Sequence, residues 1–197
     1  MSQYLSIRFA EKKDVRKILN IYEPYIKNTT TTFEYEVPTL AEFEARVAHI
    51  SREYPYLVCE QKGEIIGYAY AARDRERAAY QWNAQLSVYL RQDCIGTGLG
   101  RKFYQALLDI LQLQNVTLAY GCITLPNEKS QRLHESMGFS TVGCFRKTGF
   151  KLGKWLDVLW FEKKVCPHNV PPKAFVPIHQ VADNDLQAVL TRINSTR

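Results

Sequence analysis

One stretch near the middle of the chain restricts the possible folds more than any other. Residues 86–90 (Leu-Ser-Val-Tyr-Leu) are mostly β-branched, aromatic or aliphatic, which is typical of a strand. Glycines follow at positions 96, 98 and 100, and residues 99–111 then carry apolar side chains at helical spacing. In such a strand, turn and helix the backbone can approach an anion closely and direct free N–H groups at it. The stretch therefore predicts a phosphate-binding turn within an α/β fold.

The rest of the chain alternates predicted strands and helices around one mixed sheet. Strands are expected at residues 6–9, 55–61, 64–72, 80–90, 116–124, 140–145 and 155–164. A helix capped by Asp14 is expected to be kinked or ended by Pro24. Thr39 and Glu42 form the capping box of a second helix, residues 99–113 form a third, and Asn127 caps a fourth that ends before Gly138.

Composition places the chain among globular proteins. It has 197 residues, of which 46% are hydrophobic and 23% charged, enough for one domain with a full core. We expect residues 1–165 to form that domain, and residues 166–197 a proline-rich C-terminal extension with a short helix near residues 185–193. The first residues lack a signal-peptide core and no apolar run approaches the length of a membrane span. A cytoplasmic protein with no membrane partner is therefore expected.

Cysteine usage and charge exclude further classes. The five cysteines are odd in number and form no C-x-x-C pair, which argues against a disulfide framework and against a metal site. The net charge of +6 is compatible with a polyanionic ligand. No stripe of basic and aromatic residues accompanies that charge, so we expect no nucleic-acid partner.

Three nucleotide-binding interpretations compete for the glycine turn. A Walker A loop requires Gly-Lys-Ser/Thr, but Gly100 is followed by Arg101, Lys102 and Phe103. A dinucleotide fingerprint requires G-x-G-x-x-G near the first strand and an acidic residue about 20 positions later, and neither is present. The pyrophosphate loop of an acetyl-coenzyme A site, Q/R-x-x-G-x-G/A, fits at its end, Gly98-Leu99-Gly100.

Other motifs agree with the third interpretation in order and spacing, from about residue 6 to 165. They are Asn-Thr-Thr-Thr-Thr-Phe-Glu at 28–34, Gly-Tyr-Ala-Tyr at 67–70, Ala-Tyr-Gln-Trp at 79–82, Ser-Val-Tyr-Leu at 87–90, Leu-Pro-Asn at 125–127, Leu-His-Glu-Ser-Met-Gly-Phe at 133–139 and Gly-Phe-Lys-Leu-Gly-Lys-Trp-Leu-Asp at 149–157. With these motifs the chain resembles the GNAT superfamily of acetyltransferases, and within it the phosphinothricin and methionine sulfoximine N-acetyltransferases. The resemblance implies a single GNAT domain, with a mixed, mostly antiparallel sheet flanked by helices.

The resemblance also implies acetyl-CoA as cosubstrate, no metal, and direct attack of a neutral amine on the thioester in a ternary complex. Main-chain groups of the turn would cradle the pyrophosphate, and the open edge of the preceding strand would pair with the pantetheine amides. The residues expected to bind the coenzyme are Val88, Tyr89, Leu90, Gly96, Thr97, Gly98, Leu99, Gly100, Arg101 and Asn127. The Val88 N–H is the expected donor to the thioester carbonyl. Ile95 stands where the family has Gln or Arg.

Three residues are expected to carry the catalytic chemistry. Related enzymes have a glutamate base in a Trp-x-x-Glu motif, but this chain has Gln85, which can only orient water or substrate. Asn127 and His134 fall on one helix face, from which His134 could relay protons between the amine and the departing thiolate. Asn127 is also explained as a helix cap alone, and His134 as a surface or core residue.

The acceptor implied by the resemblance is a small amino-acid analogue. Its anionic group would be bound by Arg75 and Arg77, and Phe33, Glu34 and Tyr70 would shape the pocket, although residues 73–77 also fit a solvated charged loop. Relatives are commonly homodimers. Two alternatives remain open: acetylation of a peptide N-terminus or another amine, and a non-catalytic acyl-CoA-binding module, which Gln85 motivates.

Overall fold

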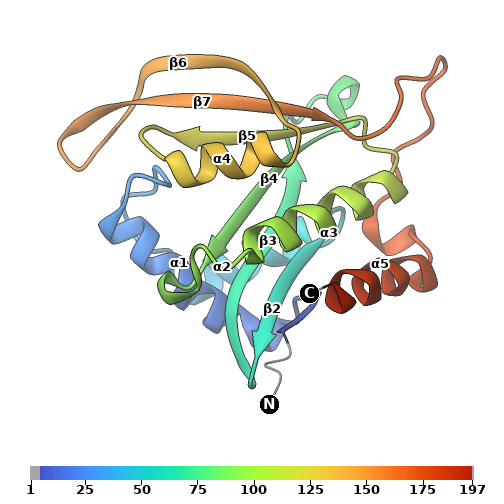
Figure 1. Cartoon of the computed structure of the whole chain (residues 1–197), viewed down its shortest axis with the longest axis horizontal. Helices are drawn as coiled ribbons and strands as arrows, with labels where there is room; N and C mark the ends of the chain where they lie inside the picture. The colour runs from blue at the N-terminus through green and yellow to red at the C-terminus, as the bar shows by residue number, and fades with distance from the viewer. Residues whose placement is uncertain (1–4, 197) are drawn as a thin grey trace.

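The structure is a computed structural model and describes residues 5–196 of the chain. Over that range seven strands form one sheet in the order β1-β2-β3-β4-β5-β7-β6 (Figure 1). The strands are β1 (Leu5–Phe9), β2 (Tyr56–Gln61), β3 (Glu64–Arg73), β4 (Asn83–Leu90), β5 (Leu118–Thr124), β6 (Ser140–Lys151) and β7 (Lys154–Lys164). The helices are α1 (Val15–Asn28), α2 (Leu40–Ile50), α3 (Leu99–Leu113), α4 (Glu128–Ser136) and α5 (Asp183–Ser195). The predicted mixed α/β fold is confirmed.

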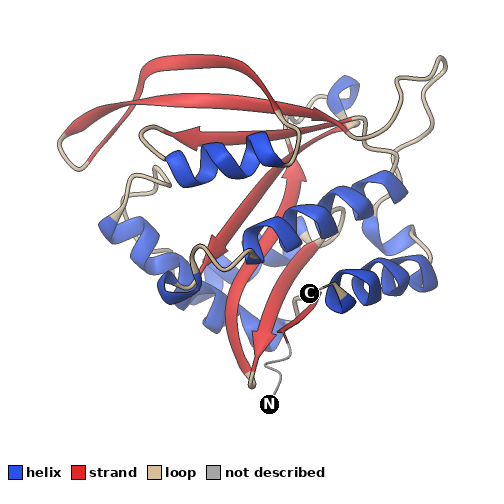
Figure 2. Ribbon diagram, in the orientation of Figure 1, coloured by secondary structure: helices blue, strands red, loops and turns tan. Residues whose placement is uncertain are grey.

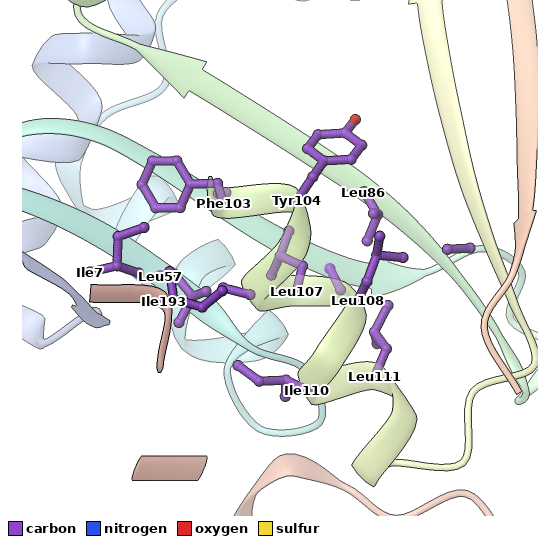
Figure 3. Close-up of a cluster of buried hydrophobic side chains, with 14 of the residues drawn as sticks. Ile7, Leu57, Leu86, Phe103, Tyr104, Leu107, Leu108, Ile110, Leu111 and Ile193 are labelled. Atoms are coloured by element: carbon purple, nitrogen blue, oxygen red, sulfur yellow. The ribbon is translucent and has the colours of Figure 1, made fainter. Parts of the chain in front are cut away.

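Two cores lie on opposite faces of the sheet (Figure 2). One face packs against α1 and α2 through the buried rings of Tyr22, Tyr56 and Tyr68. The other packs against α3, whose Phe103 and Leu107 are fully buried, as expected from the helical spacing (Figure 3). All strand pairs except β4–β5 are antiparallel.

Some expected elements are placed differently. Residues 80–82 do not belong to β4, because residues 78–80 form a short 3₁₀ turn and the strand begins at Asn83. Pro24 does not end α1, which continues to Asn28. The Asp14 side chain does not cap α1; its carboxylate binds the Arg8 guanidinium instead, at 2.7 Å. β6 continues to Lys151 because it pairs with β7 along most of its length.

The C-terminal helix α5 packs onto the face that α3 covers. Its Leu186, Leu190 and Ile193 are buried in the same core, and Ile193 lies beside Leu57 of β2 (Figure 3). The Asn194 amide accepts from the Ile7 N–H at 2.7 Å and donates to the Ile7 carbonyl at 3.0 Å. These bonds satisfy main-chain groups on the outer edge of β1, which is the first strand of the sheet.

We expect Ile193→Ala to lower the free energy of unfolding by about 2–4 kcal/mol, because it leaves a cavity between α5 and the sheet. Thr191→Ala, on the exposed side of the same helix, is the matched control and should change stability by less than about 0.5 kcal/mol. Chemical denaturation of both variants measures the difference. Equal effects would show that α5 does not contribute to the core.

Candidate active site

Strands β4 and β5 run parallel but are paired over only part of their length. The pairs are Asn83–Leu118, Ala84–Ala119 and Gln85–Tyr120. Beyond Gln85 no pairing joins the described residues of the two strands, and they diverge. The remainder of β4, from Leu86 to Leu90, therefore has one edge that is not paired with a strand.

The register of β4 shows which of its main-chain groups face this split. Arg91 N–H donates to the Ile66 carbonyl at 2.8 Å, so those two residues form a hydrogen-bonded pair with β3. Hydrogen-bonded and non-bonded pairs alternate along an antiparallel ladder. Val88, paired with Ala69, is thus a non-bonded position, and its N–H and carbonyl point away from β3 into the split. An extended chain of amides placed there could bond to it as an added strand does.

One end of this open edge already has a partner. The Tyr25 hydroxyl of α1 donates to the Leu90 carbonyl at 2.6 Å and lies 3.3 Å from the Leu90 nitrogen, which donates to it. The sequence alone does not indicate this contact of Tyr25. Its hydroxyl occupies the Leu90 end of the edge, so Val88, midway along it, is open for a ligand.

The glycine turn leads from this strand into α3. Gly96 and Gly98 have φ angles of +87° and +86°, a backbone conformation that favours glycine. Arg101 N–H is the first in the helix to bond back, to the Gly98 carbonyl at 3.1 Å. Within residues 5–196, the N–H groups of residues 96–100 find no acceptor. Free N–H groups at the start of a helix have an arrangement that can bind an anion.

Side chains contribute few groups that could bind a phosphate at this turn. The Thr97 hydroxyl donates to the Cys94 carbonyl at 2.8 Å, and Leu99 is buried. The Arg101 guanidinium contacts the Ser136 carbonyl at 3.3 Å, at the end of α4. A Cβ on Gly100 would lie 3.3 Å from Leu133, so this glycine brings α3 close to α4. The turn can therefore hold a phosphate mainly by its backbone.

His134 projects from α4 onto β5 and is 2% exposed. Its Nδ1 lies 2.8 Å from the Ser130 carbonyl and its Nε2 lies 2.8 Å from the Tyr104 hydroxyl. The carbonyl can only accept, so Nδ1 carries the proton and Nε2 accepts from Tyr104. Burial lowers the pKa of the imidazole below 6.5, although the Ser130 carbonyl opposes this. The residue is therefore a neutral histidine at neutral pH.

A cavity of about 60 Å³ lies between the diverging strands. Several predicted site residues line it: Val88, Tyr89, Asn127 and His134. Tyr104, Cys122 and Thr31, which the sequence did not single out, line it as well. Tyr104 could have been noticed as a hydroxyl within an apolar helix stripe, since a buried tyrosine usually finds a polar partner. Asn127 also caps α4 by accepting from the Ser130 N–H at 3.2 Å, as expected.

The other predicted residues lie outside this cavity. Gln85 is on the sheet face that α1 and α2 cover, one register step before the strands diverge. On that face Glu34 accepts from Arg46 at 2.6 Å and from the Tyr22 hydroxyl at 2.9 Å.

The remaining acceptor-binding candidates are spread over two regions. The Phe33 ring lies against Gly149 of β6, where a Cβ would come within 2.3 Å of it, and Tyr70 stacks on Tyr56. Arg75 and Arg77 are exposed in the loop before β4. The Arg75 guanidinium lies 4.9 Å from the Tyr80 ring centroid.

A larger cavity, of about 440 Å³, opens elsewhere, between α1 and the loop after β4. Charged side chains at its rim are paired with one another, Lys17 with Glu64 and Arg91 with Asp93. It includes neither the open edge of β4 nor the glycine turn. The smaller cavity, at the split, is therefore the candidate active site.

The lowered pKa of His134 makes folding stability depend on pH. The unfolded chain binds more protons than the folded one between the lowered pKa and 6.5, so the histidine's contribution is complete above 6.5 and declines as the pH falls. We expect His134→Gln to reduce the slope of unfolding free energy against pH between about pH 5 and 7. His49→Gln, at an exposed position, should keep the wild-type slope. Denaturation at several pH values measures both.

Comparison with known proteins agrees with this geometry. The family described as "Acetyltransferase (GNAT) domain" matches residues 7–160. A phosphinothricin N-acetyltransferase of Streptomyces viridochromogenes is 33% identical over 178 residues, which is 90% of this chain and 96% of that protein. The L-methionine sulfoximine/L-methionine sulfone acetyltransferase of Salmonella typhimurium is 32% identical, over 85% and 98% of the two chains.

A solved structure is similar over nearly the same range. It is a phosphinothricin acetyltransferase from Sinorhizobium meliloti in complex with acetyl-CoA, with a TM-score of 0.83, 29% identity, and coverage of 91% of this chain and 100% of that one. The chain belongs to the GNAT acetyltransferase family. It is an N-acetyltransferase that uses acetyl-CoA.

Proposed function

We propose that the chain transfers the acetyl group of acetyl-CoA to the amino group of a small amino-acid-like acceptor of the phosphinothricin or methionine sulfoximine type. The observation that carries this proposal is the open edge at Val88, which lies between the anion-binding turn and the cavity. The names of the relatives support the acceptor class.

The chain's own groups divide the binding between them. N–H groups of residues 96–100 bind the pyrophosphate, the Val88 main chain bonds to the pantetheine arm, and Asn127 lines the cavity. Bound acetyl-CoA supplies an activated acetyl thioester. Phe33, Glu34, Tyr70, Arg75 and Arg77 remain our candidates for holding the acceptor, on the α1–α2 face and the adjoining loop.

Direct transfer, without an acyl-enzyme, is consistent with the low reactivity of the Cys122 thiol, which lies in the cavity. Burial, with the nearby Asp74 charge, raises the pKa of Cys122 to about 11. The thiolate is the reactive form, and it is scarce at neutral pH.

The Val88 N–H is suited to stabilise the thioester carbonyl oxygen as it gains charge. Tyr104 and His134 form a hydrogen-bonded pair beside it that can return a proton to the departing thiolate, and Gln85 can orient a water molecule.

We also propose that the protein is a cytoplasmic homodimer without nucleic-acid or membrane partners. The β6–β7 hairpin exposes large apolar side chains: Val142, Phe145, Phe150, Leu152 and Trp155. Apolar surface of this extent is typical of an interface. All five cysteines are free, as expected in a reducing compartment. Among residues 5–196 no helix is long and apolar enough to span a membrane. Light scattering should report a dimer, and Trp155→Glu should yield monomer.

Release of coenzyme A tests the acceptor class. We expect turnover with phosphinothricin, methionine sulfoximine and methionine sulfone, each giving the N-acetyl product by mass spectrometry. Turnover only with peptides would favour acetylation of a protein N-terminus. Binding of acetyl-CoA without turnover of any amine would favour a non-catalytic binding module, to which Gln85 points.

A further inference from the structure

The amine acceptor is proposed to bind on the sheet face that α1 and α2 cover. Because residue 85 is a glutamine, this face lacks the carboxylate that related enzymes use to take up the amine's proton. An amino acid at neutral pH carries an ammonium group, and its nitrogen must lose a proton before it can attack. An amide side chain cannot take that proton. If the proposed function is correct, another group on this face must do so.

A carboxylate lies near Gln85 on the neighbouring strand. It belongs to Asp74, two residues beyond Ala72, which is the β3 partner of Gln85. In the register of the sheet, Ala72 of β3 and Tyr120 of β5 flank Gln85 on either side. Side chains two apart along a strand share a face. Asp74 directly follows Arg73, the last residue of β3, and continuing the alternation by one residue places it on the side of the sheet that carries Gln85 and Tyr120.

The Asp74 carboxylate is unusually buried for a loop residue. Its side chain is 7% exposed, and its ion pair is with the neighbouring Arg75, whose Nε lies 3.4 Å away. Arg75 itself is 64% exposed, and its guanidinium lies 4.9 Å from the Tyr80 ring centroid. Within residues 5–196 no other donor is bonded to Asp74.

The Asp74 charge acts on two side chains of β5. Asp74 contributes to the raised pKa values of the Tyr120 hydroxyl and the Cys122 thiol. Cys122 lines the cavity between β4 and β5. Glu162, which pairs with Tyr120 from β7, also acts on Tyr120 but not on Cys122. Asp74 thus lies close enough to both Tyr120 and Cys122 for its charge to act on them.

The other acidic candidates are already bonded. Glu34 is held by Arg46 and by the Tyr22 hydroxyl. Asp157 accepts the Lys147 N–H at 2.7 Å. Both carboxylates are therefore already occupied by donors of the chain itself.

We propose that Asp74 replaces the missing base: it accepts, through one water oriented by Gln85, the proton released by the acceptor's ammonium group. The proton passes from nitrogen to water while a water proton passes to an Asp74 oxygen. The freed lone pair on nitrogen then forms the C–N bond as the C–S bond breaks. The thiolate takes a proton from the Tyr104–His134 pair, and the pair regains one from the nitrogen of the new amide. Asp74 returns its proton to solvent.

A rescue experiment tests this assignment with the full-length enzyme and methionine sulfoximine or phosphinothricin, whichever the wild type turns over. Asp74→Asn should lower kcat about 100-fold, the scale of general base catalysis, and leave the dissociation constant for acetyl-CoA unchanged. Asp74→Asn combined with Gln85→Glu should recover kcat to within about 10-fold of wild type, because it restores a carboxylate one strand away. Glu162→Gln is the matched control and should keep wild-type kcat.

The outcomes separate the proposal from the function on which it depends. Wild-type turnover with unchanged kcat in Asp74→Asn would overturn the role of Asp74 and keep the function. A large loss in Asp74→Asn that Gln85→Glu does not rescue would assign Asp74 a structural role and also overturn the proposal. No turnover by the wild type with any amine would contradict the proposed function itself.

Discussion

Gly98→Ala is expected to weaken acetyl-CoA binding about 100-fold while the protein stays folded. Gly98 has a φ of +86° and begins α3, and a Cβ at this position would meet no atom of the chain within 4 Å. The folded state therefore loses only the backbone preference, about 1–2 kcal/mol. The added methyl group occupies the space through which a pyrophosphate would reach the N–H groups of the turn.

Gly63→Ala is the matched control for this substitution. Gly63 has a φ of +80° in the β2–β3 turn, and a Cβ there would likewise meet no atom within 4 Å. This turn lies outside the proposed site. Both variants should lose similar stability in denaturation, and only Gly98→Ala should lose affinity in calorimetric titration with acetyl-CoA. Equal affinities in the two variants would show that the turn does not bind the coenzyme.

Gly121→Ala is expected to lower the free energy of unfolding by about 3 kcal/mol. A Cβ on Gly121 would lie 2.1 Å from His134 Nε2. The imidazole cannot move aside freely, because it stacks on Phe161 at 4.9 Å and both nitrogens are hydrogen-bonded. The variant must displace the ring, so it should also break the Tyr104–His134 bond and lower kcat.

The double variant with His134→Ala distinguishes this clash from other effects. Removing the ring should make Gly121→Ala nearly neutral, so the two substitutions should be strongly non-additive in denaturation. Gly143→Ala, on β6 with nothing within 4 Å of its Cβ, should change stability little. Additive effects of Gly121→Ala and His134→Ala would mean that His134 does not occupy the position over Gly121.

The features that the sequence predicted well depend on neighbouring residues. The span of α3 follows from its apolar spacing, and the glycine turn from residues that adopt positive φ. The same holds for the Thr39–Glu42 capping box and the Asn127 cap, each closed within four residues. Local patterns of this kind specify a helix end or a turn without tertiary contacts.

Features that depend on distant contacts were not predictable. Asn194 bonds to Ile7 across nearly the whole chain, and no local pattern indicates that α5 completes the edge of β1. The length of β6 is set by its pairing with β7. The neutral state of His134 depends on burial and on Tyr104, which lies on another helix. Asp74 looked like one charge in a solvated loop, and only the folded chain shows its burial.

The central claim is that the split between β4 and β5, with its glycine turn, binds acetyl-CoA. Amide hydrogen exchange followed by NMR, with and without acetyl-CoA, tests it directly. We expect new protection at Val88 and at residues 96–100, whose N–H groups are free of partners within the described chain. Protection confined to Asn20, Ile21 and Gln92, around the larger cavity beside α1, would contradict it.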